Sequence, residues 1–309
     1  MFKFCCHFVA LFTCLGCCLS SAHADITVTD DAGRTVNVKQ PARRIVSLSP
    51  HTTELLFSAG AGDYVVAVSA FSDFPEQAKK LPVISGGTGV DIERILGFEP
   101  DLVVAWLSGN SRLQLKKLES LGLTVFYSEP VTIEGIASNI ESLGLLSGTS
   151  GYASQIAAQF KIGVDQLSST YQNAPEMSAF FQIWNPPLMT IGGRHLISQW
   201  MALCGVRNVF AEESPLALVV SKESVLLSDP DVLISGQYGL SIESFQNSWG
   251  KWKHLRANVS EKLIVQDATV LARQVPRALD SAIQLCQALD QFRPVHSSAT
   301  KRQGFLPAR

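Results

Sequence analysis

The sequence carries no excess of charge of either sign. Its 309 residues include 25 lysines and arginines against 27 aspartates and glutamates, for a net charge of −2. A balance so close to neutral provides no basic surface for nucleic acid. Beyond the N-terminal segment the sequence also lacks an apolar run of about twenty residues, the length that spans a bilayer. We therefore expect two ordinary domains and no polytopic membrane protein.

Signatures of catalysis and of metal binding are also missing. The sequence has no Gly-x-Ser-x-Gly elbow, and its six histidines show no His-x-x-x-His spacing. The glycine-rich residues 86–89 lack the lysine of a phosphate-binding loop and predict a tight strand-to-helix turn facing a cleft. We expect no enzyme, no cofactor and no metal ion. A secreted α/β enzyme stays an alternative, because fold alone does not exclude one.

Cysteine is scarce outside the N-terminal segment. Residues 1–24 combine Lys3, a short apolar stretch and an Ala-x-Ala ending, which predicts a signal peptide cleaved after Ala24 and an exported protein. Lipidation is the less favoured alternative, because no cysteine there follows a Leu-small-small sequence. The mature chain keeps only Cys204 and Cys286, which suggests one disulfide, with two buried free thiols as the alternative.

One short pattern occurs twice, over residues 93–104 and 223–234. Each copy contains a glutamate, a short apolar helical stretch, an acidic-Pro-Asp sequence and an apolar strand. Because the copies lie in different halves of the chain, they predict two similar lobes. Each lobe then has an acidic residue, Glu93 or Glu223, at the start of a helix. The alternative role for both is to offset the helix dipole.

Strands alternate with helices on both sides of one long helical segment. This alternation predicts two α/β lobes with parallel sheets covered on both faces. Residues 152–171 have apolar side chains at helical spacing and predict about 30 Å of helix, which joins the lobes stiffly. The expected parts are a β-hairpin (25–43), an N-terminal lobe (44–148), the linking helix (149–174), a C-terminal lobe (175–293) and a frayed tail (294–309).

Aromatic and basic side chains are expected at the ends of strands or on loops, where α/β proteins bind ligands. Phe71, Trp106, Trp184 and Arg273 suit a pocket for a large, flat ligand, although a core role is the alternative for the two tryptophans. His51 follows a strand end and either faces the ligand or lies in a capped or exposed turn. Two further residues, flanked by lysines, predict an exposed helix or loop: Trp249 and Trp252.

Several motifs match a known family in order along residues 43–292. They lie at residues 44–50, 53–55, 71–75, 101–106, 185–187, 204–205 and 276–277, with Cys286. The sequence resembles the periplasmic cobalamin-binding proteins of ABC importers, in a superfamily with siderophore and haem binders. This resemblance implies a periplasmic protein whose two lobes are joined rigidly by one long helix, with the ligand cleft between the lobes.

The resemblance also implies roles for particular residues. Glu93 and Glu223 match the acidic pair that docks onto arginines of a dimeric permease, and Cys204 and Cys286 match the family disulfide. Phe71 replaces a family tyrosine, whereas Trp106 matches a family tryptophan. The remaining expected ligand contacts are Pro50, His51, Gly87, Leu188 and the segment Thr269, Val270, Leu271, Ala272 and Arg273. Gly87 and Leu188 stand where the family has aromatic residues, each worth about 1 kcal/mol of stacking.

These patterns together lead to one expected function. We expect a monomeric solute-binding protein that captures cobalamin or another corrinoid and delivers it to a dimeric ABC permease, without chemistry of its own. The nearest alternative is a haem or ferric-siderophore binder of the same fold, with His51 or a tyrosine as the haem ligand, or Arg273 contacting an anionic siderophore. A metal-ion binder is disfavoured because histidines and carboxylates do not cluster.

Overall fold

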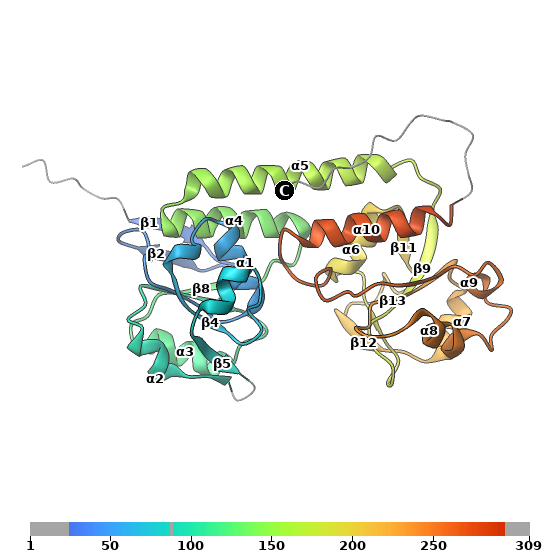
Figure 1. Ribbon diagram of the computed structural model, residues 1–309, viewed down its shortest axis with the longest axis horizontal. Helices are drawn as coiled ribbons and strands as arrows, with labels where there is room; N and C mark the ends of the chain where they lie inside the picture. Colours follow the sequence, from blue (N-terminus) through green and yellow to red (C-terminus); the bar gives the residue numbers. More distant parts are fainter. Residues whose placement is uncertain (1–24, 87–88, 294–309) are drawn as a thin grey trace, which may run out of the picture.

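The computed structural model describes residues 25–86 and 89–293 (Figure 1). The expected signal peptide (1–24), Gly87 and the expected tail (294–309) lie outside the described residues. The chain forms two α/β lobes joined by a single long helix, as the sequence predicts. In Figure 1 the lobes lie side by side, with helix α5 along their upper edge and helices α2 and α7 at their lower edge.

The N-terminal lobe contains a six-stranded sheet in the order β6-β5-β4-β3-β7-β8. All neighbouring strands are parallel except β5 and β6. Alternate residues of the strands pack with α1 and α4 on one face and with α2 and α3 on the other. The strands are β3 (Ile45–Ser47), β4 (Val65–Ser69), β5 (Val83–Gly86), β6 (Gly89–Val90), β7 (Leu102–Trp106) and β8 (Val125–Ser128). The helices are α1 (Pro50–Ser58), α2 (Ile92–Gly97), α3 (Arg112–Ser120) and α4 (Ile133–Ser147), with 3-10 turns at Gly62–Tyr64 and Glu76–Lys80.

The expected N-terminal hairpin is present and packs against this lobe. Strand β1 (Ile26–Thr29) pairs antiparallel with β2 (Thr35–Val38). The buried carboxylate of Asp30 accepts hydrogen bonds from the Arg34 side chain and from the backbone N–H of Tyr127 on β8. The hairpin is therefore anchored to the sheet by a buried charge as well as by apolar contacts.

Helix α5 (Ser150–Tyr171) joins the lobes and is buried along one stripe. The buried residues recur every three or four positions: Ala153, Ala157, Phe160, Val164, Leu167 and Tyr171. They belong to one hydrophobic core that runs from the N-terminal lobe into the C-terminal lobe. Phe160 also meets Trp200 of α6 edge to face at 6.5 Å. Since α5 packs on both lobes, it connects them stiffly rather than as a free linker.

The C-terminal lobe has a smaller parallel sheet in the order β11-β9-β13-β14 and a separate antiparallel pair, β10 and β12. Its strands are β9 (Met177–Gln182), β10 (Met189–Ile191), β11 (Val206–Asn208), β12 (Ala217–Val219), β13 (Val232–Ser235) and β14 (Leu263–Val265). Its helices are α6 (Leu196–Leu203), α7 (Lys222–Ser228), α8 (Ile242–Trp249), α9 (Arg256–Val259) and α10 (Ala278–Asp290).

A disulfide joins Cys204, at the end of α6, to Cys286 on α10, with Cα atoms 5.0 Å apart. The predicted disulfide is confirmed, and it joins two helices of the C-terminal lobe. Within the described ranges no helix is long and apolar enough to cross a membrane.

The prediction of an exposed surface around Trp249 is wrong. The Trp249 side chain is fully buried and packs edge to face on Phe180 at 5.6 Å. The adjacent lysines do not indicate exposure of Trp249, because α8 directs this side chain into the core. The Lys251 ammonium lies instead over the ring of Trp252, 4.3 Å from its centre. Lysine beside tryptophan therefore indicates a cation–π contact at the edge of the core rather than exposure.

Candidate functional site

Strands β3 and β7 are parallel neighbours, and their carboxyl ends bring two of the expected ligand residues together. Pro50 and His51 begin α1 directly after β3, and Trp106 is the last residue of β7. The rings of His51 and Trp106 meet edge to face, with centroids 5.4 Å apart and an interplanar angle of 83°. Nε1 of Trp106 is buried and has no hydrogen-bond partner in the described part of the chain. Unpaired buried donors are uncommon and mark places where a water or a ligand is accommodated.

His51 is held in its neutral form by its surroundings. Only 3% of the residue is exposed, and its Nδ1 lies 3.0 Å from the hydroxyl of Ser49. Burial, with a further contribution from the positive charge of Arg273, lowers the pKa of His51 to about 3. The imidazole ring is therefore uncharged at physiological pH.

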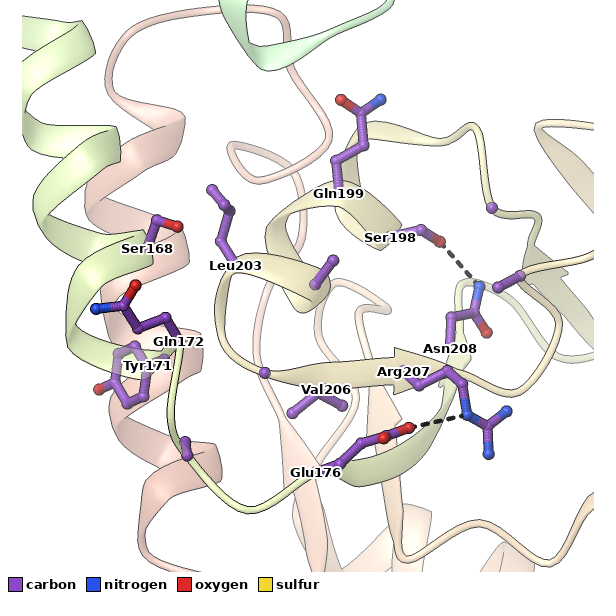
Figure 2. A pocket seen from close by; sticks show the side chains of 15 residues that line it. Ser168, Tyr171, Gln172, Glu176, Ser198, Gln199, Leu203, Val206, Arg207 and Asn208 are labelled. Carbon is purple, nitrogen blue, oxygen red and sulfur yellow. Dashed lines mark hydrogen bonds and ion pairs between the residues drawn. The ribbon is translucent and has the colours of Figure 1, made fainter.

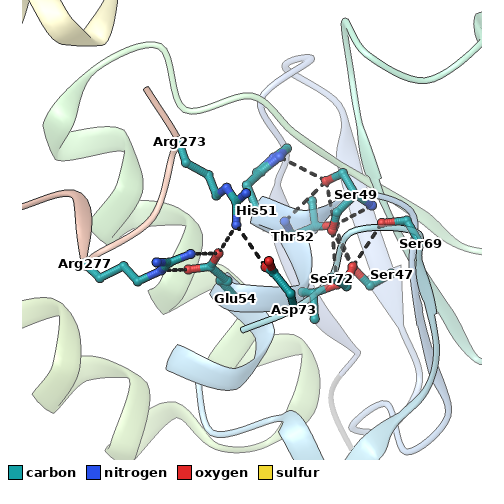
Figure 3. A network of polar contacts seen from close by, with 11 residues as sticks. Ser47, Ser49, His51, Thr52, Glu54, Ser69, Ser72, Asp73, Arg273 and Arg277 are labelled. Carbon is teal, nitrogen blue, oxygen red and sulfur yellow. Dashed lines mark hydrogen bonds and ion pairs between the residues drawn. The ribbon is translucent and has the colours of Figure 1, made fainter. Parts of the chain in front are cut away.

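A buried carboxylate, Glu54, links the two lobes, as Figure 3 shows. Glu54 lies on α1 and is 3% exposed, whereas Arg273 and Arg277 lie between β14 and α10 of the other lobe. Arg273 donates from Nη1 to Glu54 at 2.6 Å, and Arg277 donates from Nε and Nη2 at 2.6 and 2.7 Å. Such charge-assisted, bidentate contacts are the strongest hydrogen bonds in proteins.

Glu54 and Arg277 lie within the family motifs at 53–55 and 276–277, but no sequence pattern predicts a role for either residue. One sequence signal could have indicated that Glu54 is buried: it is followed directly by Leu55 and Leu56, in an apolar part of a predicted helix. The pairing itself spans more than two hundred residues of sequence, so local patterns do not contain it.

A network of hydroxyl groups fixes the start of α1 against the neighbouring loop (Figure 3). Ser47 binds Thr52 and Thr53 at 2.7 and 2.8 Å, and Thr53 binds Ser72 at 3.0 Å. Ser72 in turn binds Ser69 at the end of β4. The network therefore positions the loop that carries Phe71 and its neighbours.

Phe71 lies on this loop in an unusual conformation. Its φ is 63°, a value disfavoured for bulky residues, and its side chain is 83% exposed. Strained residues of this kind concentrate at binding sites. An aromatic ring held in solvent by a fixed loop is available to stack on a ligand.

The other expected ligand residues differ in exposure. Thr269 and Ala272 are exposed and Val270 is half-buried, whereas Leu271 is 1% exposed and belongs to the core. Leu188 is 7% exposed and packs in the cluster around Phe180 and Trp249. Trp184 is 49% exposed and donates from Nε1 to the backbone of Pro186. The structure thus brings Pro50, His51, Trp106 and Arg273 together and leaves Leu188 and Leu271 in hydrophobic cores.

A small pocket of about 60 Å³ lies between the lobes. Glu129, Pro130 and Val131 line it from one lobe, and Arg194, His195, Leu196, Leu216, Ala272 and Gln274 line it from the other. This volume is far below the roughly 300–1,000 Å³ of pockets that enclose a drug-sized ligand. The pocket in this conformation is therefore too small to enclose a large ligand.

A larger pocket, of about 610 Å³, lies elsewhere, at the end of α5 and beside α6 and β11 (Figure 2). None of the expected ligand residues lines it. The hydroxyl of Ser198 donates to the Gly192 carbonyl and accepts from Asn208, and Glu176 pairs with Arg207. These four polar side chains are thus engaged with neighbouring protein groups.

The repeated sequence pattern forms equivalent structures in the two lobes. Asp91 and Ser221 cap α2 and α7 by accepting from the backbone N–H of Arg94 and Ser224. The helices are followed by Glu99 and Asp229, which both take positive φ values, 46° and 39°. The predicted internal similarity therefore extends to individual backbone conformations.

The aspartate of the acidic-Pro-Asp sequence in each copy binds backbone at or just before the neighbouring strand. Asp101 accepts hydrogen bonds from the backbone N–H groups of Arg43 and Arg44, the two residues that immediately precede β3. Asp231 accepts from the backbone N–H of Ser178 on β9. Both contacts align the repeat unit with the strand beside it, so the two helices have equivalent positions on their sheets.

Glu93 and Glu223 occupy the same first-turn position on these equivalent helices. Both are exposed, and within the described residues neither side chain makes a hydrogen bond or an ion pair. Figure 1 places α2 and α7 at the lower edge of separate lobes, away from α5. The pair is therefore free to bind cations at two separated points.

The periplasmic binding protein family matches residues 45–267. The chain belongs to this family. The vitamin B12-binding protein of Vibrio campbellii is 35% identical over 254 residues, which cover 82% of this chain and 91% of that protein. The vitamin B12-binding protein of Yersinia pestis is 37% identical over 250 residues, 81% of this chain and 87% of that protein.

Solved structures agree with this fold. The periplasmic vitamin B12 binding protein BtuF of Vibrio cholerae is 35% identical, covers 82% of this chain and 98% of its own, and gives a TM-score of 0.73. The periplasmic haem-binding protein BhuT gives a TM-score of 0.72 at 17% identity, which shows a shared fold alone. The predicted two-lobe architecture is thus confirmed by relatives as well as by the structure.

Proposed function

We propose that this chain is the solute-binding protein of an ABC importer, which captures cobalamin or a related corrinoid in the periplasm. The observation that carries the proposal is the convergence of Trp106, His51 and Arg273 at the junction of the lobes, in a chain 35–37% identical to vitamin B12-binding proteins. The first 24 residues act as the export signal in this proposal. No catalytic step is involved.

The residues at the junction suit a large ligand with a flat ring and polar side arms. Phe71 supplies an exposed aromatic face, and Trp106 supplies a second aromatic ring with an unpaired N–H donor. Stacking on each ring contributes about 1 kcal/mol beyond the area buried. Arg273 supplies a cation for the amide or phosphate oxygens of a corrinoid.

Delivery requires contact with a membrane partner, and we assign that contact to Glu93 and Glu223. A dimeric permease presents the same surface twice, and this chain presents a similar acidic helix once on each lobe. Carboxylate–arginine pairs at two separated points fix orientation as well as affinity. The binding protein itself acts as a monomer in this arrangement.

The haem alternative is less well supported by the site. His51, which with a tyrosine was one of the two expected iron ligands, is 3% exposed, and its Nδ1 lies against the hydroxyl of Ser49. The other ring nitrogen, Nε2, has no hydrogen-bond partner in the described part of the chain but is buried, so an iron atom reaches it only if this nitrogen becomes exposed. The site therefore favours a ligand recognised by stacking and hydrogen bonding over one held by a metal–histidine bond.

The proposal is tested by co-elution of ligand with the protein. Residues 25–309 are mixed with excess cyanocobalamin or with excess haemin and passed over a size-exclusion column while visible absorbance is recorded. The assignment is supported if one cyanocobalamin co-elutes per chain and if haemin in the protein fraction does not exceed the level of a protein-free blank. Stoichiometric haemin with a shifted absorption band and no cyanocobalamin would replace it with the haem alternative.

A further inference from the structure

The ion cluster formed by Glu54, Arg273 and Arg277, here called the interlobe bridge, is built asymmetrically. Arg277 uses Nε and Nη2 in a bidentate contact with Glu54, and its guanidinium lies over the ring of Phe74, 4.3 Å from the ring centre. The N-terminal lobe thus contacts one edge of this guanidinium through Glu54 and one face through Phe74. Arg277 is a fixed strut between the lobes.

Arg273 is engaged differently. It donates to Glu54 from Nη1 alone, and the same nitrogen lies 3.6 Å from Asp73. Its Nε and Nη2 donate no hydrogen bond within residues 25–86 and 89–293, and the side chain is 17% exposed. Arginine has five N–H donors in a rigid fork, so most of those of Arg273 remain available.

The charges show why Glu54 is needed. Two guanidinium groups meet one buried carboxylate, and among the described residues the only other acid in contact is Asp73, whose side chain is 63% exposed. Without the Glu54 charge, two cations face each other in a site with little water. Breaking such a buried group by removing one partner is strongly unfavourable, so the segment that carries both arginines would move.

We propose that Glu54 is a positioning residue for ligand capture. Its carboxylate holds Arg277 across the lobe boundary and so sets the separation of the lobes, and it holds segment 269–273 so that the free donors of Arg273 face acceptor oxygens of the ligand. The role of Arg273 toward the ligand rests on the proposed function. The role of Arg277 in setting the lobe separation rests on the geometry alone.

The experiment measures lobe separation and ligand affinity in the same variants of residues 25–309. Spin labels are attached at Leu113→Cys on α3 and Val259→Cys on α9, which are 79% and 69% exposed on opposite lobes. Pulsed dipolar spectroscopy gives the distance distribution without ligand, and calorimetry gives the affinity for cyanocobalamin. The variants are Glu54→Gln, Arg277→Gln and Arg273→Gln. The control, Glu141→Gln, removes an ion pair with Lys161 between α4 and α5.

The bridge predicts a separate result for each variant. Glu54→Gln and Arg277→Gln broaden or shift the distance distribution and weaken binding by about tenfold or more, as expected when a buried charge loses its partner. Arg273→Gln weakens binding but keeps the distribution of the unsubstituted protein, because Arg277 still spans the lobes. Glu141→Gln changes neither quantity.

Other results overturn the proposal. An unchanged distance distribution in both Glu54→Gln and Arg277→Gln removes the structural role, and unchanged affinity in Glu54→Gln removes the positioning role. If Glu54→Gln does not fold, Arg277→Gln decides the question by the same two measurements. If the unsubstituted protein does not bind cyanocobalamin, the proposed function fails, while the distance distributions alone still decide whether the bridge sets the lobe separation.

Discussion

Removal of the disulfide between Cys204 and Cys286 should destabilise the protein by an amount that follows from the loop it closes. The two residues are 82 positions apart. The chain-entropy relation then gives an entropy loss in the unfolded chain worth about 4.5 kcal/mol at 25 °C. Domains are typically stable by about 5–15 kcal/mol, so this contribution is a large share of the total.

The assay is equilibrium urea denaturation of residues 25–309, followed by tryptophan fluorescence. The variant with both cysteines changed to alanine should lose about 4.5 kcal/mol of unfolding free energy relative to the oxidised protein. Reductant should destabilise the unsubstituted protein by a similar amount and leave the variant unaffected. A loss below about 1 kcal/mol, or equal sensitivity of both proteins to reductant, would refute the argument that the bond restricts the unfolded chain.

Three further predictions follow from the site and its surroundings. Changing both Glu93 and Glu223 to lysine should abolish stimulation of the cognate permease in proteoliposomes and leave cyanocobalamin affinity unchanged. The control Asp165→Lys on α5 should change neither transport nor affinity. Full transport by the double variant would remove the docking role. Trp106→Ala should weaken cyanocobalamin binding by about fivefold or more in calorimetry, because a lost stacking contact is worth about 1 kcal/mol or more. Unchanged affinity would exclude the ring from the site. Because the pKa of His51 is about 3 when folded and 6.5 ordinarily, the unfolded chain binds a proton first as the pH falls, so stability should decrease between those values by up to about 1.4 kcal/mol per pH unit. His51→Gln should reduce that slope in urea titrations at pH 4 to 7, and an identical slope in the variant would contradict the buried neutral ring.

Local patterns predicted much of the fold. Apolar or helical periodicity between clear breaks predicts a strand over 102–106, a helix over 196–203 and a strand over 263–265. These ranges coincide with β7, α6 and β14, because the breaks define both ends of each element. The linking helix was expected over 149–174 and runs over Ser150–Tyr171. The short strands β10 and β12 were not predicted, since three residues carry no period that separates a strand from a loop.

The candidate site was predicted less completely than the fold. Residues at strand ends, such as His51 and Trp106, could be named because parallel strands place their carboxyl ends together. Glu54 and Arg277 could not be given a role, since their contact depends on how the two lobes meet. Leu188 and Leu271 were expected at the ligand and lie in the core, because a position matched to a family does not specify which way its side chain points.

The most direct test of the proposed function is calorimetric titration of residues 25–309 with cyanocobalamin. We predict saturable binding of one ligand per chain, which would establish a corrinoid-binding protein in which Phe71, Trp106 and Arg273 suffice without the other family aromatics. If no heat of binding is detected at any cyanocobalamin concentration up to its solubility limit, corrinoid capture is contradicted. The fold, the disulfide and the interlobe bridge would stand in that case, and the ligand would have to be sought among haem and siderophores.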